Sequence, residues 1–500
     1  MPETELPTIH AAVARQALMR PDVTALAFKG TRTSYAELNA AADAAASGLR
    51  ALGVGPGSLV PVLLSRSPEL VVALLAVLKC GAAYSALDHR WPAARTAAVV
   101  RALGAPFVIT DGRLPGLDTP TRPLPYGDPA EAAEPDRVGA AVPAAVFFTS
   151  GTTGTPKGVL SPHRATTRLF AGRTFADFGR GRAMVQAAPV SWDAFHLELW
   201  GMLTTGGTAV LADGDYLFPG DLRDLVKSAA VDSLWLTASL FNLFVDEDID
   251  SFAGIRQVMT GGERLSVPHV RAFLARHPHI ALVNGYGPVE SCVFATTRAV
   301  RPTDCELPDG VPVGRPVPGT AVHLLDGDHV LGDGRPGEIC VAGEGLALGY
   351  LGHPAATAEK FVVVDVDGLP TRLYRTGDLG RRDPDGVLHF LGRADRQVKI
   401  SGYRVEPAET ERAACGVPGV RECAVVPVPG GDGTWEGLAL FYRSDAGEPG
   451  PEALRRVLAD RLPHYLTPAS VHHHAEAFPR TANGKLDRAA LLNSLDEPSR

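Results

Sequence analysis

The ten residues from Thr149 to Gly158 (TSGTTGTPKG) constrain the fold more than any other stretch of this sequence. They follow an apolar run, residues 144–148, whose length and composition predict a buried strand. The ten residues include three glycines, which let a backbone turn tightly and approach a ligand, five hydroxyl side chains and one lysine. A strand that ends in such a loop is a common way to hold phosphate, because backbone N–H groups and hydroxyls point at the anion.

This loop differs from the phosphate loop of P-loop NTPases. That motif ends in Gly-Lys-Ser/Thr at the start of a helix, whereas here Lys157 lies between Pro156 and Gly158. Pro156 would interrupt a helix at that point. The sequence instead predicts a later helix start, with Ser161 as N-cap and Pro162 as the first helical residue. P-loop NTPase chemistry is therefore excluded.

Length and charge restrict the class of protein. Five hundred residues are too many for one hydrophobic core, so several domains are expected. The apolar share of 45% and the charged share of 21% are those of a globular protein. The formal net charge of −8 gives no electrostatic footprint for nucleic acid or anionic lipid, so neither is expected as a partner.

Cysteines and apolar runs bear on the cellular compartment. None of the six cysteines has CxxC spacing, so neither a disulfide framework nor a zinc site is predicted. The N-terminus is acidic and lacks a signal-peptide core. The longest apolar run, Leu70 to Leu78, is far shorter than the ~20 residues of a membrane span. We expect a reduced, cytoplasmic protein.

Strand and helix patterns alternate through the first three hundred residues, which predicts an α/β fold of sheets flanked by helices. From about residue 320 the pattern changes to short strands and Gly-rich turns, which predicts an antiparallel β-subdomain. Past Asp395 the pattern predicts a separate α+β module. The expected domains are therefore a large core over residues 1–393 and a small C-terminal domain over residues 394–500.

Eight separated segments resemble, in order, those of the adenylate-forming superfamily, and specifically of the amino-acid adenylation domains of nonribosomal peptide synthesis. They are Thr33 to Leu38, Leu78 to Asp88, Thr149 to Gly158, Asn284 to Glu290, Tyr350 to Phe361, Tyr374 to Leu379, Gly392 to Glu411, and Asn483 to Lys485. The resemblance spans nearly the whole chain. It implies a large N-terminal domain of mixed and parallel sheets with a β-subdomain, followed by a small mobile C-terminal domain.

The resemblance also implies a ligase that works in two steps, with ATP and Mg²⁺ as cofactors. An amino-acid carboxylate attacks the α-phosphate of ATP and gives an aminoacyl-adenylate and pyrophosphate. A phosphopantetheine thiol on a carrier protein then attacks the acyl carbon and releases AMP. Antibiotic biosynthesis is the setting in which such enzymes are expected.

Matching motif by motif assigns the groups that would bind Mg·ATP. The loop residues Thr149, Ser150, Gly151, Thr152, Thr153, Gly154 and Lys157 would cover the β- and γ-phosphates. Asn284, Gly285 and Tyr286 would hold adenine, with the tyrosine stacked on it. Asp378, with Arg393 nearby, would accept the ribose hydroxyls. Glu290 would bind Mg²⁺, which prefers oxygen ligands, and Lys485 would bridge the substrate carboxylate and the α-phosphate.

Asp193 decides the branch of the superfamily. In the amino-acid-activating relatives an aspartate at this position pairs with the α-ammonium group of the substrate, and acyl- and aryl-acid relatives lack it. A buried carboxylate without a cationic partner would be costly, which favours this role. The alternative is an ordinary aspartate at a helix N-terminus, stabilised by the helix dipole.

The positions that would line the substrate pocket are almost all uncharged. They are Asp193, Ala194, Leu197, Trp235, Met259, Gly261, Gly285, Val293, Phe294 and Lys485. A polar substrate side chain would be left unsatisfied there. The bulky members fill volume, and the two glycines are expected to leave room near the β-carbon of the substrate. The pocket predicts a small-to-medium aliphatic amino acid, valine first, then 2-aminobutyrate or isoleucine.

The second step is expected to need a rotation of the small domain about Asp395, the family's hinge position. In one pose Lys485 would enter the site, and in the other residues 399–403 would face it. Two residues depart from the family pattern. Val289 stands where a threonine hydroxyl would contact the α-phosphate, and Ser401 replaces a basic residue.

If Met1 and Arg500 are true ends, we expect a free-standing enzyme that loads a carrier protein in trans, with a small helper protein as a further candidate partner. An excised domain of a larger synthetase is the competing explanation. Two other functions stay open. An acyl-CoA synthetase would release an acyl-CoA, and a catalytically silent carrier-docking module would show no exchange.

Overall fold

The computed structural model describes residues 6–112, 117–128, 138–150, 156–172, 175–430, 434–444, 448–480 and 486–495. The chain forms two compact units. The first comprises Met1–His89, Val100–Phe148 and Gly158–Ala394, and the second comprises Arg90–Val99, Thr149–Lys157 and Asp395–Arg500. The second unit thus starts one residue after the domain boundary expected from the sequence, and it also takes in two earlier segments.

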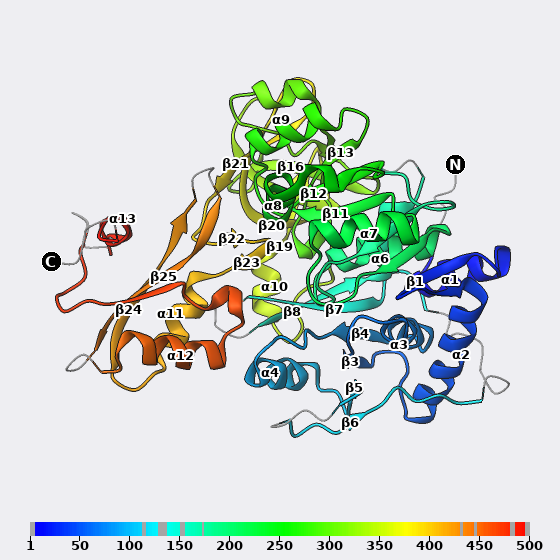
Figure 1. Cartoon of the computed structure of the whole chain (residues 1–500). Helices are drawn as coiled ribbons and strands as arrows, with labels where there is room; N and C mark the ends of the chain where they lie inside the picture. Colours follow the sequence, from blue (N-terminus) through cyan, green and yellow to red (C-terminus); the bar gives the residue numbers. More distant parts are fainter. Residues whose placement is uncertain are drawn as a thin grey trace. The chain divides into compact units, whose positions relative to one another are not determined.

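A nine-stranded sheet is the largest element of the first unit (Figure 1). Six neighbouring strands from β13 to β1 run parallel, and antiparallel strands extend both edges. In spatial order the strands are β15(Arg315–Pro316), β14(Thr296–Ala299), β13(Ala281–Tyr286), β12(Gln257–Gly261), β11(Ser233–Thr237), β9(Ala183–Gln186), β10(Thr208–Leu211), β1(Thr24–Phe28) and β2(Thr31–Ser34). The strand–helix alternation predicted this parallel core.

Two six-stranded sheets complete the strands of the first unit. One has the order β6(Thr121–Arg122), β5(Val108–Thr110), β3(Leu59–Leu63), β4(Ala83–Ala86), β7(Pro143–Thr149) and β8(Lys157–Pro162). The other is the antiparallel β-subdomain, with β17(His329–Val330), β16(Thr320–Asp326), β18(Gly337–Gly343), β20(Leu369–Arg382) and β19(Phe361–Val366) in order and β21(Leu388–Arg393) paired to β20. Its first strand in the chain, β16, begins at Thr320.

The helices described between residues 9 and 360 belong to the first unit, except that residues 93–99 of one helix belong to the second. They are α1(Ile9–Met19), α2(Tyr35–Ala51), α3(Pro68–Lys79), α4(Ala93–Leu103), α5(His163–Thr167), α6(Ala194–Thr205), α7(Pro219–Ala229), α8(Ala238–Asp248), α9(Val267–Arg276) and α10(Pro354–Lys360). Helix α2 starts with a capping box in which Ser34 accepts from Glu37 N and Glu37 accepts from Ser34 N. None of the described helices is long and apolar enough to cross a bilayer.

The nine-stranded sheet separates two apolar clusters. Trp235, Met259 and Val283 belong to one cluster, which includes α6, and alternate residues such as Leu234 and Val258 belong to the other. The alternation follows from the pleat, which sends successive side chains to opposite faces. Both faces are covered, as parallel sheets require.

The second unit is a small α+β body. It contains the hairpin β22(Val398–Ile400)–β23(Tyr403–Val405) and the sheet β24(Val420–Pro429), β25(Trp435–Ser444) and β26(Ser470–His473). Its helices are α11(Pro407–Cys415), α12(Pro451–Arg461) and α13(Arg488–Asn493). Leu440, Leu454 and Leu458 lie in its main apolar cluster.

The predicted helix start at Ser161 is wrong. Residues Lys157–Pro162 form strand β8, and the short helix α5 begins at His163 with Pro162 as its N-cap and no side-chain cap. Gly158 and Val159 favour the strand, because a Cβ at Gly158 would lie 3.0 Å from Val146 and Val159 is fully buried. Packing against β7 therefore overrides the local cap signal.

Candidate active site

Asp193 lies at the N-cap position of α6, but its side chain does not cap the helix. Its Oδ2 accepts the backbone N–H of Val293 at 2.7 Å. Burial raises the pKa of Asp193 to about 6, Val293 N–H opposes the shift, and the nearby charge of Glu290 adds to it. A carboxylate in this setting is stabilised by a cation. Asp193 makes no capping hydrogen bond, but it lies at the N-terminus of α6, so stabilisation by the helix dipole stays an alternative.

Buried polar contacts fix the helix that carries Asp193. Glu198 Oε2 accepts from Gln186 Nε2 and from the N–H groups of Ala187 and Ala188, just after β9. Burial raises the pKa of Glu198 to about 8. On the same helix His196 contacts the hydroxyl of Tyr84 through Nε2 at 2.6 Å. These contacts hold α6 against the sheets on which the site is built.

The turn that presents Val293 N–H is strained. Cys292 and Val293 have φ of 52° and 61°, a region that a β-branched residue rarely adopts. Arg168, fully buried, donates through Nη2 to the carbonyl oxygens of Ser291 and Phe294, both at 2.8 Å. The arginine therefore holds both ends of the turn, and surrounding structure of this kind is what keeps a strained backbone in place.

Six of the predicted pocket residues lie in one apolar cluster. They are Ala194, Leu197, Trp235, Met259, Val293 and Phe294. Helix α6 supplies the first two, neighbouring strands β11 and β12 the next two, and the segment before β14 the last two. Residues far apart in the sequence thus belong to one apolar cluster, and we call these six the apolar wall. Two of its members, Ala194 and Val293, adjoin Asp193.

Trp235 adds one polar atom to this wall. Its side chain is 7% exposed. Among the described residues, its indole N–H has no hydrogen-bond acceptor. A buried donor of this kind is costly unless a ligand or water satisfies it.

The expectation that Gly261 and Gly285 leave open space is corrected by the geometry. A Cβ on Gly261 would lie 2.0 Å from the carbonyl oxygen of Gly285, and a Cβ on Gly285 would lie 2.1 Å from the Phe294 ring. The two positions need glycine because adjacent strand ends and an aromatic ring pack directly against them. The Phe294 ring occupies the space that the sequence pattern assigns to the substrate.

A second polar group lies where β13, β20 and β21 meet. The hydroxyl of Tyr286 donates to Asp378 Oδ2 at 2.6 Å, and Arg393 donates to Asp378 Oδ1. Burial, and then the charge of Asp378, raises the pKa of Tyr286 well above its usual value, so the hydroxyl stays protonated. Each carboxylate oxygen keeps a further lone pair with which it can accept another hydroxyl.

Asn284 is placed differently from the other nucleotide-site predictions. Its side chain is buried, and its Nδ2 donates to the carbonyl oxygen of Pro312 at 2.9 Å. One of the two N–H donors of the Asn284 side chain is thus already bonded within the protein, to Pro312 in the segment before β15. A contact between Asn284 and adenine stays a prediction.

Glu290 lies in a short 3-10 turn after β13 and is buried. Its Oε1 accepts the hydroxyl of Tyr350 at 2.8 Å. Among the described residues no group of three His, Cys, Asp or Glu side chains is arranged to hold a metal. One oriented carboxylate fits Mg²⁺, which usually takes one or two protein carboxylates and completes its shell with phosphates and water.

Part of the phosphate loop and the terminal lysine lie outside the described residues. Gly151, Thr152, Thr153 and Gly154 belong to this undescribed part, and so does Lys485. Within the second unit, Ser150 Oγ donates to the carbonyl oxygen of Arg404 at 2.7 Å. Thr149 ends β7 and Lys157 begins β8, at the two edges of the loop.

Sequence reasoning missed three residues that shape the site. Tyr350 orients Glu290, Arg168 holds the 291–294 turn, and Phe175 packs its ring edge-to-face with Phe294 at 5.3 Å. Only Tyr350 gave a signal, as the first residue of one of the matched segments. A buried arginine and a loop phenylalanine cannot be recognised before the fold brings their partners to them.

Comparison with known proteins agrees with this geometry. The profile of the family described as AMP-binding enzyme matches residues 13–351, and that of the AMP-binding enzyme C-terminal domain matches residues 409–485. Gramicidin S synthase 2 of Brevibacillus brevis is 34% identical over 97% of this chain, and malpibaldin synthetase of Mortierella alpina is 37% identical over 97%. The chain spans 11% and 9% of the length of these two relatives.

Solved structures match over nearly their whole length. PA1221, described as a nonribosomal peptide synthetase protein containing adenylation and PCP domains, is 37% identical with a TM-score of 0.88, and the match covers 99% of this chain and 98% of that one. NpsA–ThdA, described as an artificially fused adenylation–PCP di-domain from Klebsiella oxytoca, is 25% identical with a TM-score of 0.82, and the match covers 94% of each chain. The predicted adenylate-forming fold is thereby confirmed. The chain belongs to the AMP-binding enzyme family and is an ATP-dependent, amino-acid-activating ligase of the nonribosomal peptide synthetase adenylation type.

Proposed function

We propose that this enzyme activates a small-to-medium aliphatic L-amino acid, valine first and then 2-aminobutyrate or isoleucine, and loads it on a carrier protein supplied in trans. The observation that carries the proposal is the position of Asp193. Its carboxylate, partly buried and held by Val293 N–H, borders an apolar cluster. An aliphatic α-amino acid offers an ammonium group to the carboxylate and an apolar side chain to the cluster.

The wall formed by Leu197, Met259 and Phe294 supports the aliphatic part of the substrate. These side chains offer no charge and no amide, so a substrate with a charged side chain would lose its hydration without compensation. The Phe294 ring over Gly285 favours a short side chain over an aromatic one. One methylene more or less discriminates by only about 10–200-fold, so related aliphatic acids should share the site.

Asp378 and Tyr286 support the nucleotide part of the proposal. The carboxylate, oriented by Arg393 and by the tyrosine hydroxyl, would accept the ribose hydroxyls. Glu290, oriented by Tyr350, would hold Mg²⁺, which supplies positive charge beside the phosphates during adenylation. The loop from Thr149 to Lys157 and the terminal Lys485 keep their expected roles toward the phosphates and the substrate carboxylate.

The carrier protein follows from the chemistry and from the relatives. An aminoacyl-adenylate is a mixed anhydride that a thiol attacks at the acyl carbon, with AMP as leaving group. PA1221 contains an adenylation domain together with a PCP domain, and NpsA–ThdA is an artificial fusion of the same two kinds of domain. A phosphopantetheine thiol is therefore the proposed acceptor of the activated amino acid.

Amino-acid-dependent ATP–pyrophosphate exchange tests the proposal. Valine should give the highest exchange among the proteinogenic amino acids, with 2-aminobutyrate and isoleucine next. The matched comparison is 3-methylbutanoate, which has the valine skeleton without the amine, and it should give no exchange. Asp193→Asn should lose exchange with valine, because the amide cannot neutralise the ammonium group.

The same assay separates the competing functions. Exchange with amine-free acids and release of an acyl-CoA would identify an acyl-CoA synthetase. No exchange with any acid, from folded protein with Mg²⁺, would favour a silent carrier-docking module and direct attention to Val289. Faster turnover of leucine or phenylalanine than of valine would contradict the pocket assignment alone.

A further inference from the structure

Four phenylalanine rings form a row beside the apolar wall of the site. Phe170 and Phe178 have ring centroids 5.0 Å apart, Phe178 and Phe175 are 5.7 Å apart, and Phe175 and Phe294 are 5.3 Å apart. The interplanar angles are 76°, 80° and 76°, so each contact is edge-to-face. Such contacts favour one ring orientation over others. Only the last ring, Phe294, was among the predicted pocket residues.

Glycines hold both ends of this aromatic row. A Cβ on Gly201 of α6 would lie 3.0 Å from the Phe170 ring and 3.2 Å from the Phe178 ring. Gly201 is one turn beyond Leu197 on the same face of the helix. At the other end the Phe294 ring lies against Gly285. The row therefore reaches from the pocket helix to the strand end that bears the pocket glycine.

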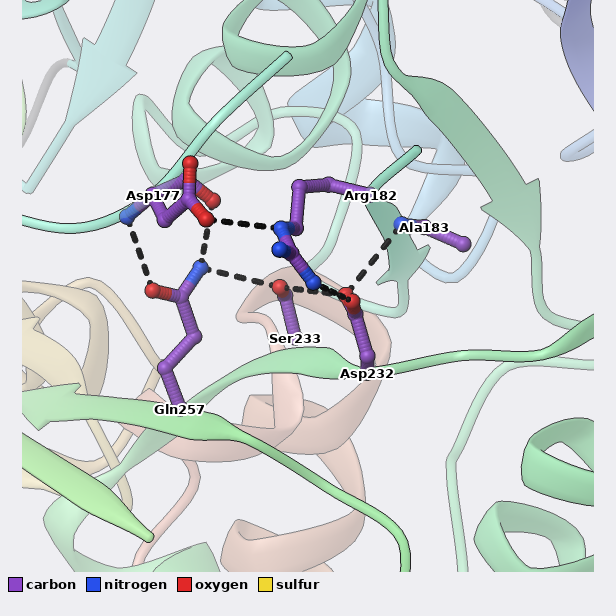
Figure 2. Close-up of polar contacts among 6 residues, drawn as sticks. All are labelled: Asp177, Arg182, Ala183, Asp232, Ser233 and Gln257. Carbon is purple, nitrogen blue, oxygen red and sulfur yellow. Dashed lines mark hydrogen bonds and ion pairs between the residues drawn. The ribbon is translucent and has the colours of Figure 1, made fainter. Parts of the chain in front are cut away.

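Phe175 and Phe178 lie on a loop that a polar cluster ties to the sheet (Figure 2). Asp177 N donates to Gln257 Oε1 and Gln257 Nε2 donates to Asp177 O, both at 2.8 Å. Gln257 Nε2 also donates to Ser233 Oγ at 2.9 Å. Arg182 joins Asp177 to Asp232 with contacts of 2.7 and 2.8 Å. The backbone two residues after Phe175 is thus fixed by side chain and main chain together.

The residues that hold this loop and two of the predicted pocket residues lie on the same two strands. Gln257 and Ser233 are the first residues of β12 and β11, and Met259 and Trp235 come two residues later on each. A rigid strand therefore connects the position of the loop with the position of the pocket wall. The loop cannot move away from Phe294 without breaking the paired hydrogen bonds of Gln257.

We propose that Phe175 is a positioning residue for substrate specificity, which supports the Phe294 ring over Gly285 and so closes the side-chain end of the pocket. This inference rests on the proposed function, because it concerns which amino acid the site accepts. Truncation of Phe175 removes the edge-to-face support of Phe294. The ring can then turn into the vacated space and leave room for a longer substrate side chain.

The test measures kcat and KM by ATP–pyrophosphate exchange for valine, leucine and phenylalanine in the wild type and in Phe175→Ala. We expect the leucine-to-valine ratio of kcat/KM to rise about tenfold or more. This lies within the range of discrimination that one or two methylene groups produce in a hydrophobic pocket. The KM for valine should rise while kcat for valine changes little, because the reacting groups are untouched. Phe175→Leu should restore most of the wild-type ratio.

Two further variants separate positioning from loss of stability. Gln257→Met removes the paired hydrogen bonds to Asp177 and should shift the ratio in the same direction, although Gln257 does not border the site. Phe244→Leu removes a ring that packs against Phe252 in the apolar cluster on the other face of the sheet. It should lower the melting temperature without changing the ratio.

An unchanged leucine-to-valine ratio in folded Phe175→Ala overturns the inference. If Phe175→Ala fails to fold, an unchanged ratio in both Phe175→Leu and Gln257→Met overturns it as well. The proposed function fails in a different way, by the absence of amino-acid-dependent exchange in the wild type. The wild-type measurement is therefore made first.

Discussion

The backbone N–H of Val293 donates to Oδ2 of Asp193 over 2.7 Å, although 100 positions separate the two residues in the sequence. The donor is presented by a turn with two consecutive positive φ angles. The acceptor lies at the start of a helix whose own N–H groups it does not cap. A strained turn and a partly buried carboxylate are therefore in contact at the place where we propose that the substrate ammonium group binds.

Replacement of Asp193 by Asn should remove activity and add stability. The folded-state pKa of about 6 lies above the ordinary value of 3.8, so the carboxyl group's contribution to stability is present below about pH 4 and is lost as the pH rises through 6. We expect Asp193→Asn to be more stable than the wild type by about 1–2 kcal/mol at pH 7.5 and by about half as much at pH 5. Urea unfolding at the two pH values measures this.

The pH dependence of wild-type activity should report the ionisation of the same carboxyl group, that of Asp193. The wild-type kcat/KM for valine should rise with pH through about 6, because only the ionised carboxylate pairs with the ammonium group. The exposed Asp326 provides a control, and Asp326→Asn should leave both the pH profile and the stability unchanged. A stability difference that does not depend on pH would contradict the assignment of the titration to Asp193.

Arg168→Lys should loosen the strained turn. A lysine cannot reach both the Ser291 and the Phe294 carbonyl oxygens with one rigid fork, and one of these acceptors would lose its partner. We expect a loss of about 2–3 kcal/mol of unfolding free energy and a roughly tenfold higher KM for valine. The KM for ATP should stay the same. Steady-state exchange kinetics with each substrate varied in turn measure the difference.

A second substitution at the turn checks the cause. Arg168→Lys should cost about 1 kcal/mol less in a Val293→Gly background than in the wild type, because glycine adopts positive φ without steric strain and the comparison cancels the lost burial of the valine. An equal cost in both backgrounds would show that the arginine acts on something other than the turn. Equal effects on the KM of ATP and of valine would show the same.

Trp235→Phe tests whether the substrate side chain is apolar. The indole N–H has no acceptor among the described residues, and an aliphatic substrate offers none. We expect kcat/KM for valine to change by less than about threefold, since only an unpaired donor is lost. A substrate whose side chain accepts this hydrogen bond would instead lose roughly 10²-fold or more. Exchange with valine and with threonine in both proteins provides the comparison.

Ser401→Asn should stabilise the hairpin of the second unit. Ser401 and Gly402 form the two-residue loop between β22 and β23, and both have positive φ, 51° and 83°. Turns of this kind favour Asn-Gly. We expect the free energy of opening of the hairpin, measured at the backbone amides of residues 398–405, to increase by about 0.5–1 kcal/mol. Hydrogen exchange measures it, and Ser401→Ala, which keeps the strain, should give no gain.

Lys485 and Asp395 should affect different half-reactions. Lys485→Ala should abolish adenylation and spare thiolation of a supplied aminoacyl-adenylate, because the lysine is proposed to act only on the carboxylate and the α-phosphate. Asp395→Pro should do the reverse, because a fixed φ at the hinge restricts rotation of the small domain. Separate assays of pyrophosphate exchange and carrier loading distinguish them. Equal loss of both half-reactions in Lys485→Ala would contradict the assignment.

The sequence predicted the order and type of most elements because those depend on short-range chemistry. The apolar run before the phosphate loop formed the expected strand, β7. The capping box at Ser34 and Glu37 likewise depends on residues only three positions apart. Motif spacing, through the resemblance, also identified the residues that meet around Asp193 and Asp378. At Ser161 the local signal was misleading, because pairing with a neighbouring strand prevailed.

Tertiary structure alone decided how these residues contact one another. No pattern indicates that Phe294 fills the space beside Gly285, that Arg168 holds the carbonyls around a strained turn, or that Phe175 supports a pocket ring. The contacts of Arg168 and Phe175 join residues that lie more than a hundred positions apart in the sequence. The sequence specifies which chemistry is present, and close packing in the folded core, where each ring and backbone group excludes the others, determines the space that remains for a substrate.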